Sequence, residues 1–483
     1  MQRVASLDSV SRDSTREAWS EAAAAAHTSI DDNALPFELR HALYDTLVDT
    51  RLRTRLLREL LPVRNMVLFF ALGPTRSRRG FNSRDRIENV ETGGTSQPNQ
   101  STETAASVPG AKKLGGFFSG SSPMDVPGKV AIVLCCLFAV NSVRGLAFLG
   151  KLGHATFPWV LGVVFLLWWS MLTVKSFSFV FSGGFERGLS SHLEEIQAKG
   201  LYLTTDAHMR HLRAGVRAAA AVMASLTAAN SMLLPCFVLI PALGTEGLMR
   251  ELICYPLGPD HGACTTVAAL VMLLQVPLSA HWVVPVGMFV ILCRTLRHAY
   301  AQLAAELPSR LHWCRTTETG ATVKSVLAQI MLRHQELNDA VEKASKHWKW
   351  WIAAVIAFDV PLITFLVFQI IALLRAEEPA NATQLGTVVF WACSGFVHLL
   401  AVSLSAAGVT SEASSLAHHM LEPRLQELLL GNSAETHTMV LVFNKYLDEH
   451  PPCFRFLHVR ITMEAVSSVV SLIIGYIIVL ATL

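Results

Sequence analysis

Long apolar runs constrain this chain more than any other feature of its sequence. An α-helix needs about 20 apolar residues to cross the ~30 Å hydrocarbon layer of a bilayer. Only helices and closed barrels satisfy the backbone in lipid, and these runs lack the alternating pattern of barrel strands. We therefore expect an all-α membrane protein with seven transmembrane helices. The runs lie at about 128–149, 156–181, 216–242, 265–293, 349–374, 387–409 and 459–483.

The composition agrees with this interpretation. Of the 483 residues, 52% are hydrophobic and only 16% are charged, whereas soluble domains carry about 25% charged residues. We take 128–483 as the seven-helix transmembrane domain and 1–73 as a cytoplasmic N-terminal helical region. Residues 74–127 are rich in Ser, Gly, Thr, Asn, Pro and Arg and cannot bury enough apolar surface to order themselves, which predicts a disordered polar linker.

Positive charge is divided unevenly between the connections. Residues 1–129 hold 17 Lys or Arg residues, and residues 187–217, 294–349 and 424–460 hold five, nine and four. Cytoplasmic loops carry the excess of Lys and Arg. The bias therefore predicts a cytoplasmic N-terminus and an extracellular C-terminus. The alternate connections hold one such residue each: Lys151, Arg250 and Arg375.

Several single residues bear on this topology. Cys254 and Cys264 share a connection predicted to be extracellular, where a disulfide is chemically allowed, and both the bridged and the free state are open. Asn381 begins an Asn-Ala-Thr glycosylation sequon in another such connection. Two cations inside spans, Arg144 and Lys175, lie near span ends, and we expect both to snorkel to the interface.

The later spans are predicted to continue as cytoplasmic helices. An apolar stripe at helical spacing precedes span five and predicts an amphipathic helix that runs into it. Further helices are expected at 411–430, below span six, and around 436–447, before the break at Pro451-Pro452. The stripe consists of Leu327, Ile330, His334, Leu337 and Val341.

Motifs for catalysis are not found in the sequence. It has no Walker-type phosphate loop, no dinucleotide fingerprint and no Gly-x-Ser-x-Gly nucleophile turn. Its histidine pairs lack further ligands at metal spacing, and its basic N-terminal region lacks the interleaving of basic and aromatic residues that is typical of a nucleic-acid surface. We therefore expect no enzyme, no cofactor, no metal site and no nucleic-acid partner. A receptor, channel or transporter in the lipid bilayer is favoured.

Three stretches of the C-terminal half resemble the arthropod gustatory receptor family, whose members are seven-helix chemoreceptors. They are Val323–Lys346, Ser411–Leu421 and Gly475–Leu483, and the resemblance covers roughly the last 170 residues, with a fainter echo at Leu57–Pro74. The family's last helix usually ends with threonine and tyrosine, several apolar residues, then glutamine and phenylalanine. Here the tyrosine remains as Tyr476, whereas the other three positions hold Gly475, Thr482 and Leu483. The chain thus resembles a divergent member.

The resemblance implies a ligand-gated cation channel in the plasma membrane that detects small-molecule tastants. It further implies a homo- or hetero-tetramer whose seventh helices line a central cation pathway, with the cytoplasmic ends of helices four to seven as the anchor between subunits. Polar and small residues of span seven fall on one side of a helix, as a pore face or a close-packed face would require. With Tyr476 of the motif, the pore-lining candidates are Glu464, Ser468, Ser471, Gly475 and Thr482.

The resemblance also implies a ligand pocket among helices two to six, open towards the outside. Pockets are mostly apolar and hold a few polar groups that orient the ligand. An ionisable side chain near the middle of a span, such as Asp359, is costly unless it is paired or faces a wet cavity. The candidate pocket residues are Gln275, Asp359, Gln369, Trp391 and His398.

Three other functions stay open at this point, and one of them is a structural membrane protein without a ligand. A seven-helix G-protein-coupled receptor needs an extracellular N-terminus, which is the reverse of the charge bias. A polytopic transporter favours paired repeats and helices interrupted at matching positions. Here Pro277 and Pro285 are expected to interrupt span four only. The gustatory-type receptor channel is the interpretation that these features favour.

Overall fold

The structure is a computed structural model that describes residues 52–70, 126–150, 157–239, 246–258, 262–316, 323–375, 382–420, 434–449, 452–456 and 458–482. The chain divides into two compact units, Met1–Leu56 and Leu57–Leu483. The helices and contacts named below belong to the second unit. The predicted linker at 74–127 lies outside the described residues, apart from its last two positions.

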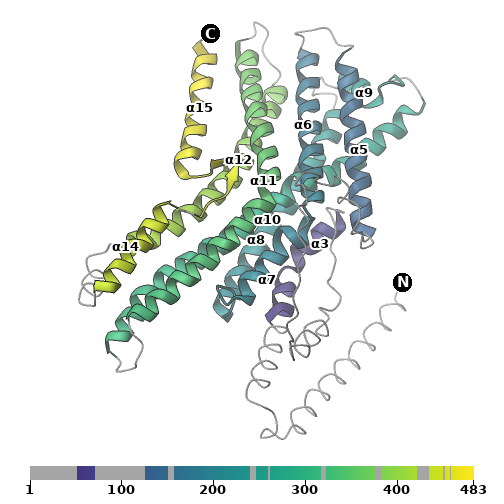
Figure 1. The fold of residues 1–483 in the computed structure, drawn as a ribbon. Coiled ribbons are helices and arrows are strands. Elements are labelled where there is room, and N and C mark those ends of the chain that lie inside the picture. The colour runs from purple at the N-terminus through teal and green to yellow at the C-terminus, as the bar shows by residue number, and fades with distance from the viewer. Residues whose placement is uncertain are drawn as a thin grey trace, which may run out of the picture. The chain divides into compact units, whose positions relative to one another are not determined.

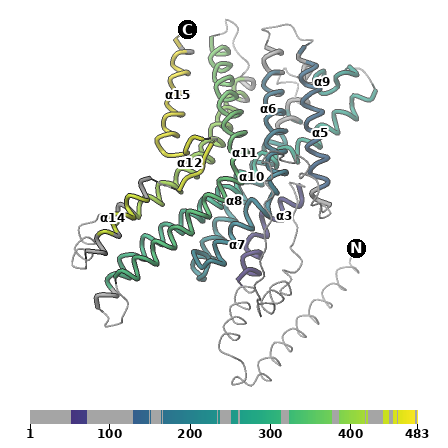
Figure 2. Tube along the Cα trace, in the orientation of Figure 1, coloured from purple at the N-terminus to yellow at the C-terminus, as the bar shows by residue number. Residues whose placement is uncertain are grey.

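Helices make up nearly all of the described part of the second unit (Figures 1 and 2). A short antiparallel hairpin of two-residue strands, Arg455–Phe456 (β1) and Val459–Arg460 (β2), stands before the last helix. The helices are α3 (Leu61–Phe69), α5 (Val126–Leu149), α6 (Phe157–Phe181), η2 (Glu186–Ser190), α7 (Ser191–Ala198), α8 (Asp206–Leu239), α9 (Glu246–Cys254), α10 (Cys264–Thr316), α11 (Val323–Arg375), α12 (Ala382–Met420), α14 (Ala434–Glu449) and α15 (Met463–Thr482).

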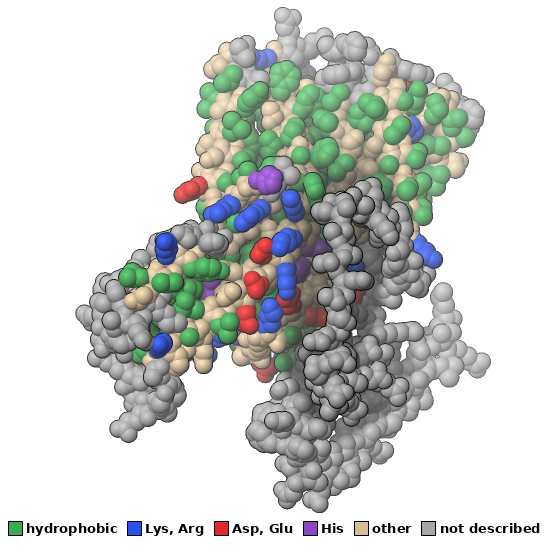
Figure 3. Space-filling model, in the orientation of Figure 1, with side chains coloured by type: hydrophobic (Ala, Val, Ile, Leu, Met, Phe, Trp, Pro, Cys, Tyr) green, Lys and Arg blue, Asp and Glu red, His purple; other side chains and the backbone are tan. Residues whose placement is uncertain are grey.

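Four of the described helices are long and apolar enough to cross a membrane. They contain the segments Lys129–Phe148, Cys264–His312, Val323–Arg375 and Val388–Leu416, and shorter apolar helices lie at Leu166–Phe181 and Met463–Val479. Figure 3 shows the corresponding division of the described surface: hydrophobic side chains cover its upper part, where α5, α6 and α15 lie in Figure 1, and charged side chains gather below, where α10 and α11 run on towards the lower left.

The helix α10 lies at the centre of the bundle. It packs against α8, α11 and α12, while α6 packs against α5 and α11, and α15 contacts α11 and α12. The expectation that Pro277 and Pro285 interrupt this helix is wrong, because α10 runs unbroken past both. Neighbouring helices and local adjustments can satisfy the carbonyl groups that a buried proline leaves free.

Two helices are much longer than a bilayer is thick. At about 1.5 Å per residue, the 53 residues of α10 and of α11 each span about 80 Å. We call the part beyond the apolar layer the helical extension: residues 294–316 of α10, 323–348 of α11 and 411–420 of α12, together with α14. The five residues of the stripe predicted in α11 are each at most 1% exposed, so the amphipathic interpretation of this segment is confirmed.

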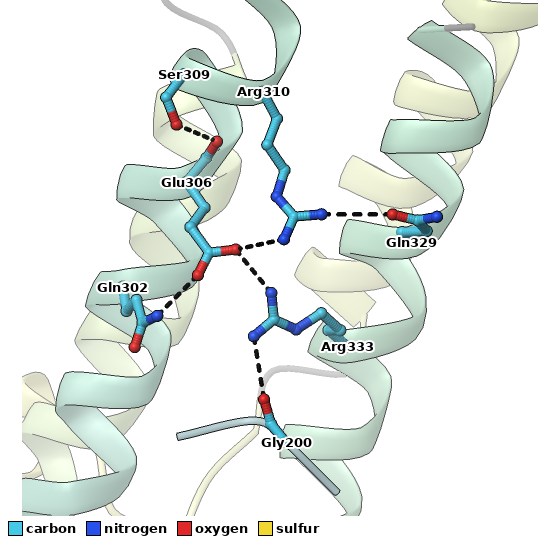
Figure 4. A network of polar contacts seen from close by, with 7 residues as sticks. All are labelled: Gly200, Gln302, Glu306, Ser309, Arg310, Gln329 and Arg333. Atoms are coloured by element: carbon cyan, nitrogen blue, oxygen red, sulfur yellow. Dashed lines mark hydrogen bonds and ion pairs between the residues drawn. The ribbon is translucent and has the colours of Figure 1, made fainter. Parts of the chain in front are cut away.

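Glu306 of α10 centres a polar network that joins the two long helices within the extension (Figure 4). Its carboxylate accepts hydrogen bonds from Gln302 Nε2 (2.8 Å) and Arg333 Nη1 (2.7 Å) and pairs with Arg310 at 3.1 Å. Arg333 also donates to the carbonyl of Gly200, at 3.4 Å. The network therefore ties α10 to α11 and to the loop that follows α7.

An aromatic cluster marks the junction between the bundle and the extension. The ring of Phe289 lies 5.3 Å from that of Trp348 and 5.1 Å from that of Phe454, which is fully buried just before the hairpin. The indole N–H of Trp348 donates to the carbonyl of Gly188 in the π-helix η2, at 3.1 Å. A Cβ at Gly188 would lie 3.2 Å from this indole, so glycine permits the close approach.

The predicted helices below spans six and seven are found in part. α12 continues to Met420, and residues 421–433, which include the rest of the helix expected at 411–430, lie outside the described residues. α14 covers the segment expected around 436–447. Arg455 of the hairpin donates its backbone N–H to Ser345 Oγ of α11, at 3.1 Å, which attaches the hairpin before α15 to the extension.

Candidate ligand cavity and the polar face of the last helix

Three ionisable side chains from three helices meet inside the apolar part of the bundle. Lys175 of α6 donates to Asp359 of α11 with an Nζ–Oδ1 distance of 2.7 Å, and His398 of α12 lies 2.6 Å from the other carboxylate oxygen. All three side chains are at most 5% exposed. Burying charges in an apolar layer is costly unless they are paired. Each member therefore requires the others.

The position of Lys175 corrects a prediction. The sequence predicts that Lys175 snorkels to the interface, but its side chain is 0% exposed and bonded to Asp359. The ammonium group of Lys175 pairs with the buried carboxylate of Asp359 and therefore does not need to reach water at the edge of the bundle. Arg144 lies near the end of α5, where it donates to the carbonyls of Ile253 in α9 and of Tyr255 just after α9.

A row of aromatic rings continues from this charged group. His398 stacks on Trp282 of α10 with 5.3 Å between the ring centres, and Trp168 of α6 lies 5.3 Å from Trp282 and 5.5 Å from Trp391. Aromatic pairs at such distances add about 0.5–1.5 kcal/mol to the burial of their area. The orientation of the His398 ring is therefore set by a carboxylate at its edge and an indole on its face.

His398 and Trp282 belong to the wall of a cavity of about 540 Å³ between α8, α10 and α12. We call it the α8–α10–α12 cavity. Its walls are mostly apolar, and its rim includes the exposed side chains of Val222, Phe390 and Val397, so it opens along one side of the bundle. Its volume falls in the range of small-molecule sites, and such sites combine apolar walls with a few polar groups. The polar side chains in its wall are Tyr202, His211, Asn230, Arg294, Thr295, His298, Ser394 and His398.

The five predicted pocket residues take different places. His398 lines the α8–α10–α12 cavity, Asp359 lies one hydrogen bond behind it, and Trp391 joins the aromatic row without lining the cavity. Gln275 faces a separate, far smaller cavity between α5, α6 and α10, and Gln369 is buried in α11 without lining the larger cavity. Contact of any of them with a ligand stays a prediction.

Two residues of the cavity wall, Asn230 and Trp282, were not predicted from the sequence. Asn230 of α8 is 2% exposed and donates its amide to Ser279 Oγ of α10 at 2.8 Å. Trp282 stacks on His398 as described above. The sequence feature that could have indicated Asn230 is its position as a single amide in the middle of the apolar run 216–242. Nothing in the sequence pairs Trp282 with His398, because the two lie on different spans.

The helix α15 turns its polar side away from the rest of the described chain. Its packed side is centred on Val466 and Ile473, at 8% and 4% exposure. At about 100° per residue, Glu464, Ser468, Ser471, Gly475 and Thr482 lie about 140–180° from Val466. These five positions are exposed, and nothing within the described chain lies within 4 Å of a Cβ built on Gly475.

The remaining predicted positions can also be placed. Tyr476 lies beside the polar face of α15, is 56% exposed and borders a groove shared with α11. Cys254 and Cys264 form a disulfide that joins α9 to the start of α10. Asn381 lies outside the described residues.

Buried and half-buried histidines characterise the charged end of the second unit. Burial lowers the pKa of His334 in α11, of His192 in α7 and of His347 in α11 to about 4 each. These imidazoles are thus uncharged at neutral pH and act as core groups. No set of three or more His, Cys, Asp or Glu side chains in the described part of the chain is placed to hold a metal ion.

Comparisons with known proteins found one family model and similar solved structures. Residues 243–481 match the family model described as "7tm Chemosensory receptor". The solved insect olfactory receptor OR5 from Machilis hrabei is similar at a TM-score of 0.57 and 12% identity, over 89% of this chain and 98% of that one. Its complex with eugenol is similar at 0.52 and 13% identity, over 90% and 99%. This likeness shows the fold. No curated protein matches the sequence.

Proposed function

Residues 243–481 match the 7tm chemosensory receptor family model, and from this premise we propose that the chain is a gustatory-type receptor subunit. In this proposal it forms a cation channel in the plasma membrane that opens when a small-molecule tastant binds. The observation that carries the proposal is the polar face of α15, which points away from every other described element. The proposal assigns no catalysis and no cofactor to the chain.

The proposed topology has seven spans, a cytoplasmic N-terminus and an extracellular C-terminus. It is supported by the excess of Lys and Arg in alternate connections. The charged helical extension then lies in the cytoplasm, and the Cys254–Cys264 disulfide lies outside the cell, where disulfides persist. Residues 128–483 form the transmembrane domain, and the region before residue 74 is cytoplasmic.

The proposed pore is formed by α15 from four identical or related subunits. A carboxylate that faced lipid would be costly, whereas a carboxylate at the mouth of a water-filled path attracts cations. Among the described residues Glu464 has no ion-pair partner, and Ser468 bonds only to the carbonyl of Glu464 in its own helix, at 2.9 Å. In the proposed pore, water and cations along a central path satisfy the polar side chains of this face, which is formed by Glu464, Ser468, Ser471, Gly475 and Thr482.

The proposed ligand site is the part of the α8–α10–α12 cavity beside Trp282 and His398. It offers an apolar wall, an aromatic face and one imidazole whose orientation is held by Asp359. The similar olfactory receptor has been solved with eugenol bound, which supports a small molecule as ligand here. We retain Gln275, Gln369 and Trp391 as candidates for contacts in other conformations.

A short mechanical route connects this site with the proposed pore. Asp359 holds His398 at the cavity wall, and the next residue, Val360, faces the groove between α11 and α15. Across that groove lie Leu472, Ile473 and Tyr476 of α15. A ligand that shifts His398 therefore acts on α11 within one residue of the surface that supports α15.

The test is an electrical recording from cells that have no related receptor of their own. The full chain is expressed and labelled at the surface, and sugars, bitter compounds and small aromatic molecules are applied. We expect a cation current that persists in excised patches without nucleotides, which separates a channel from a G-protein-coupled receptor. A transporter would show coupled flux and no such current.

Two variants localise the ligand site. His398→Gln removes the imidazole that lines the cavity and stacks on Trp282. A neutral hydrogen bond to a ligand is worth about 0.5–1.5 kcal/mol, so we expect up to about tenfold more ligand for half-maximal current. His281→Gln is the matched control. His281, which lies in α10, is buried as His398 is, but it does not line the cavity. Equal effects of both variants would remove His398 from the site. An antibody that reached residue 1, but not residue 483, on intact cells would overturn the topology and the channel together.

A further inference from the structure

The α8–α10–α12 cavity is longer than a small tastant requires. Its wall on α10 runs from Trp282 to His298, sixteen residues apart, which is about 24 Å along a helix. Between these ends the wall is formed by side chains such as Val286 and Val290 of α10 and Ala401 of α12. Because its rim is exposed, the cavity opens to the surroundings of the bundle. In a membrane those surroundings are the hydrocarbon chains of the lipids.

The end of the cavity nearest the helical extension is basic. The guanidinium of Arg294, together with His211 of α8 and His298 of α10, lines it, and the two imidazole rings lie 6.1 Å apart. Arg294 reaches across to α8, since a Cβ built on Gly215 would lie 3.4 Å from its Nη1. We call these three residues the basic end of the cavity.

Arg294 has no carboxylate partner among the described residues. Its one hydrogen bond there is from Nε to His298 Nε2, at 3.5 Å. Arg297, one turn further along the same helix, pairs with Glu412 of α12 at 3.1 Å and does not line the cavity. Arg294 is also the first charged residue after Cys264–Cys293, thirty residues without Asp, Glu, Lys or Arg. It therefore lies where the apolar layer ends and is exposed there.

We propose that the α8–α10–α12 cavity binds one anionic phospholipid, with an acyl chain along the apolar wall and the phosphate group at the basic end. An arginine without an acidic partner at the edge of an apolar layer is complementary to a lipid phosphate, which its planar fork can bind through two hydrogen bonds. The occupant comes from the leaflet on the side of the helical extension. The proposal depends on the chain spanning a membrane but not on its being a channel.

The experiment uses the full chain in lipid nanodiscs of phosphatidylcholine that contain a minor fraction of phosphatidylserine with a photoactivatable acyl chain. Illumination is followed by mass spectrometry of the labelled peptides. We expect labels on the cavity segments of α8, α10 and α12. A basic residue near anionic lipid is worth about 1 kcal/mol, or about fivefold, so Arg294→Gln is expected to lower labelling about fivefold.

Matched variants keep the result interpretable. Arg297→Gln removes the same charge from the same helix and is expected to leave labelling unchanged, whereas Arg294→Lys is expected to restore most of it. Ala219→Trp, which fills the cavity without changing charge, is expected to lower labelling. The unfolding temperature of each variant is measured, and labelling is compared only between variants that unfold at the same temperature. Arg294 is exposed, so its replacement does not disturb the core.

Four results would overturn the proposal. One is equal loss of labelling in Arg294→Gln and Arg297→Gln. Another is equal labelling by a photoactivatable phosphatidylcholine, which would show that the negative charge is not recognised. The third is cross-linking of the cavity to a second copy of the chain in place of lipid. Competition by inorganic phosphate alone would assign the basic end to a free anion and would also contradict a lipid site. Because no outcome is read as a current, failure here leaves the channel proposal intact.

Discussion

The helices α11 and α15 are both apolar over most of the layer that they are proposed to cross, yet they treat their polar residues in opposite ways. In α11, Asp359 is 1% exposed and bonded to two side chains from other helices. In α15, Glu464 is exposed and has no ion-pair partner in the described chain. A helix whose polar groups are satisfied internally is positioned by its own chain. We propose that a helix whose polar face is left unpaired in the described chain meets a partner outside it.

Breaking the internal pairing of α11 is expected to have the largest effect. Asp359→Asn leaves the fully buried Lys175 without a counter-charge, and removal of one member of a buried pair costs about 3–5 kcal/mol. We expect a clear fall in the thermal unfolding temperature of the purified protein.

A double variant separates charge from shape in this experiment. Lys175→Met combined with Asp359→Leu removes both charges and is expected to recover most of the loss, because apolar replacements of a buried pair are often tolerated. If Asp359→Asn and the wild type unfolded at the same temperature, the pair would not be what positions α11.

Acid should test the other end of α11. His334 is 0% exposed between the rings of Tyr300 and Phe443, and burial lowers its pKa to about 4. Above about pH 6.5 the imidazole is neutral in both the folded and the unfolded chain. As the pH falls from about 6.5 to about 4, only the unfolded chain takes up the proton, so the free energy of unfolding decreases by up to about 3 kcal/mol.

The measurement is the unfolding free energy of the wild type and of His334→Leu across this pH range. The variant is expected to lose less stability on acidification, although His192 and His347, whose pKa values are also about 4, keep part of the slope. Replacement of the exposed His458 by Gln serves as control and is expected to leave the slope unchanged. A His334 variant as acid-sensitive as the wild type would show that this imidazole does not stay neutral.

A charge change on α15 should leave stability almost unchanged and alter conduction. Glu464→Lys places a cation on the exposed face, and we expect the permeability of cations relative to anions to fall about tenfold, equivalent to about 1.4 kcal/mol. Glu464→Gln should give an intermediate value. Asp339→Lys, the same change at an exposed position of α11, is the matched control.

This experiment sharpens the comparison between the two helices most directly. A loss of stability in Glu464→Lys would mean that the polar face of α15 packs against protein and does not face an ion path. An unchanged permeability ratio at unchanged stability would remove Glu464 from the pore mouth.

Much of the helical organisation could be predicted from local patterns. The stripe from Leu327 to Val341 predicts an amphipathic helix because its spacing follows the helical period, and the structure buries all five of its residues. The same reasoning assigns Glu464, Ser468 and Ser471 to one side of a helix. It cannot say what that side faces. It also predicts an interruption at Pro277 and Pro285 that α10 does not have, because the carbonyl groups that a proline leaves free can find partners on neighbouring helices.

The sequence by itself determined that this chain is helical, that it is built for an apolar layer, and where charge begins again at Arg294. Hydropathy and helical period are properties of neighbouring residues, so they can be obtained without a fold. Only the tertiary structure decided that Lys175 joins Asp359, 184 residues away, and that the cavity lies between α8, α10 and α12. Such contacts depend on which faces of distant helices meet, and the free energy of burial that selects them is shared by the whole bundle.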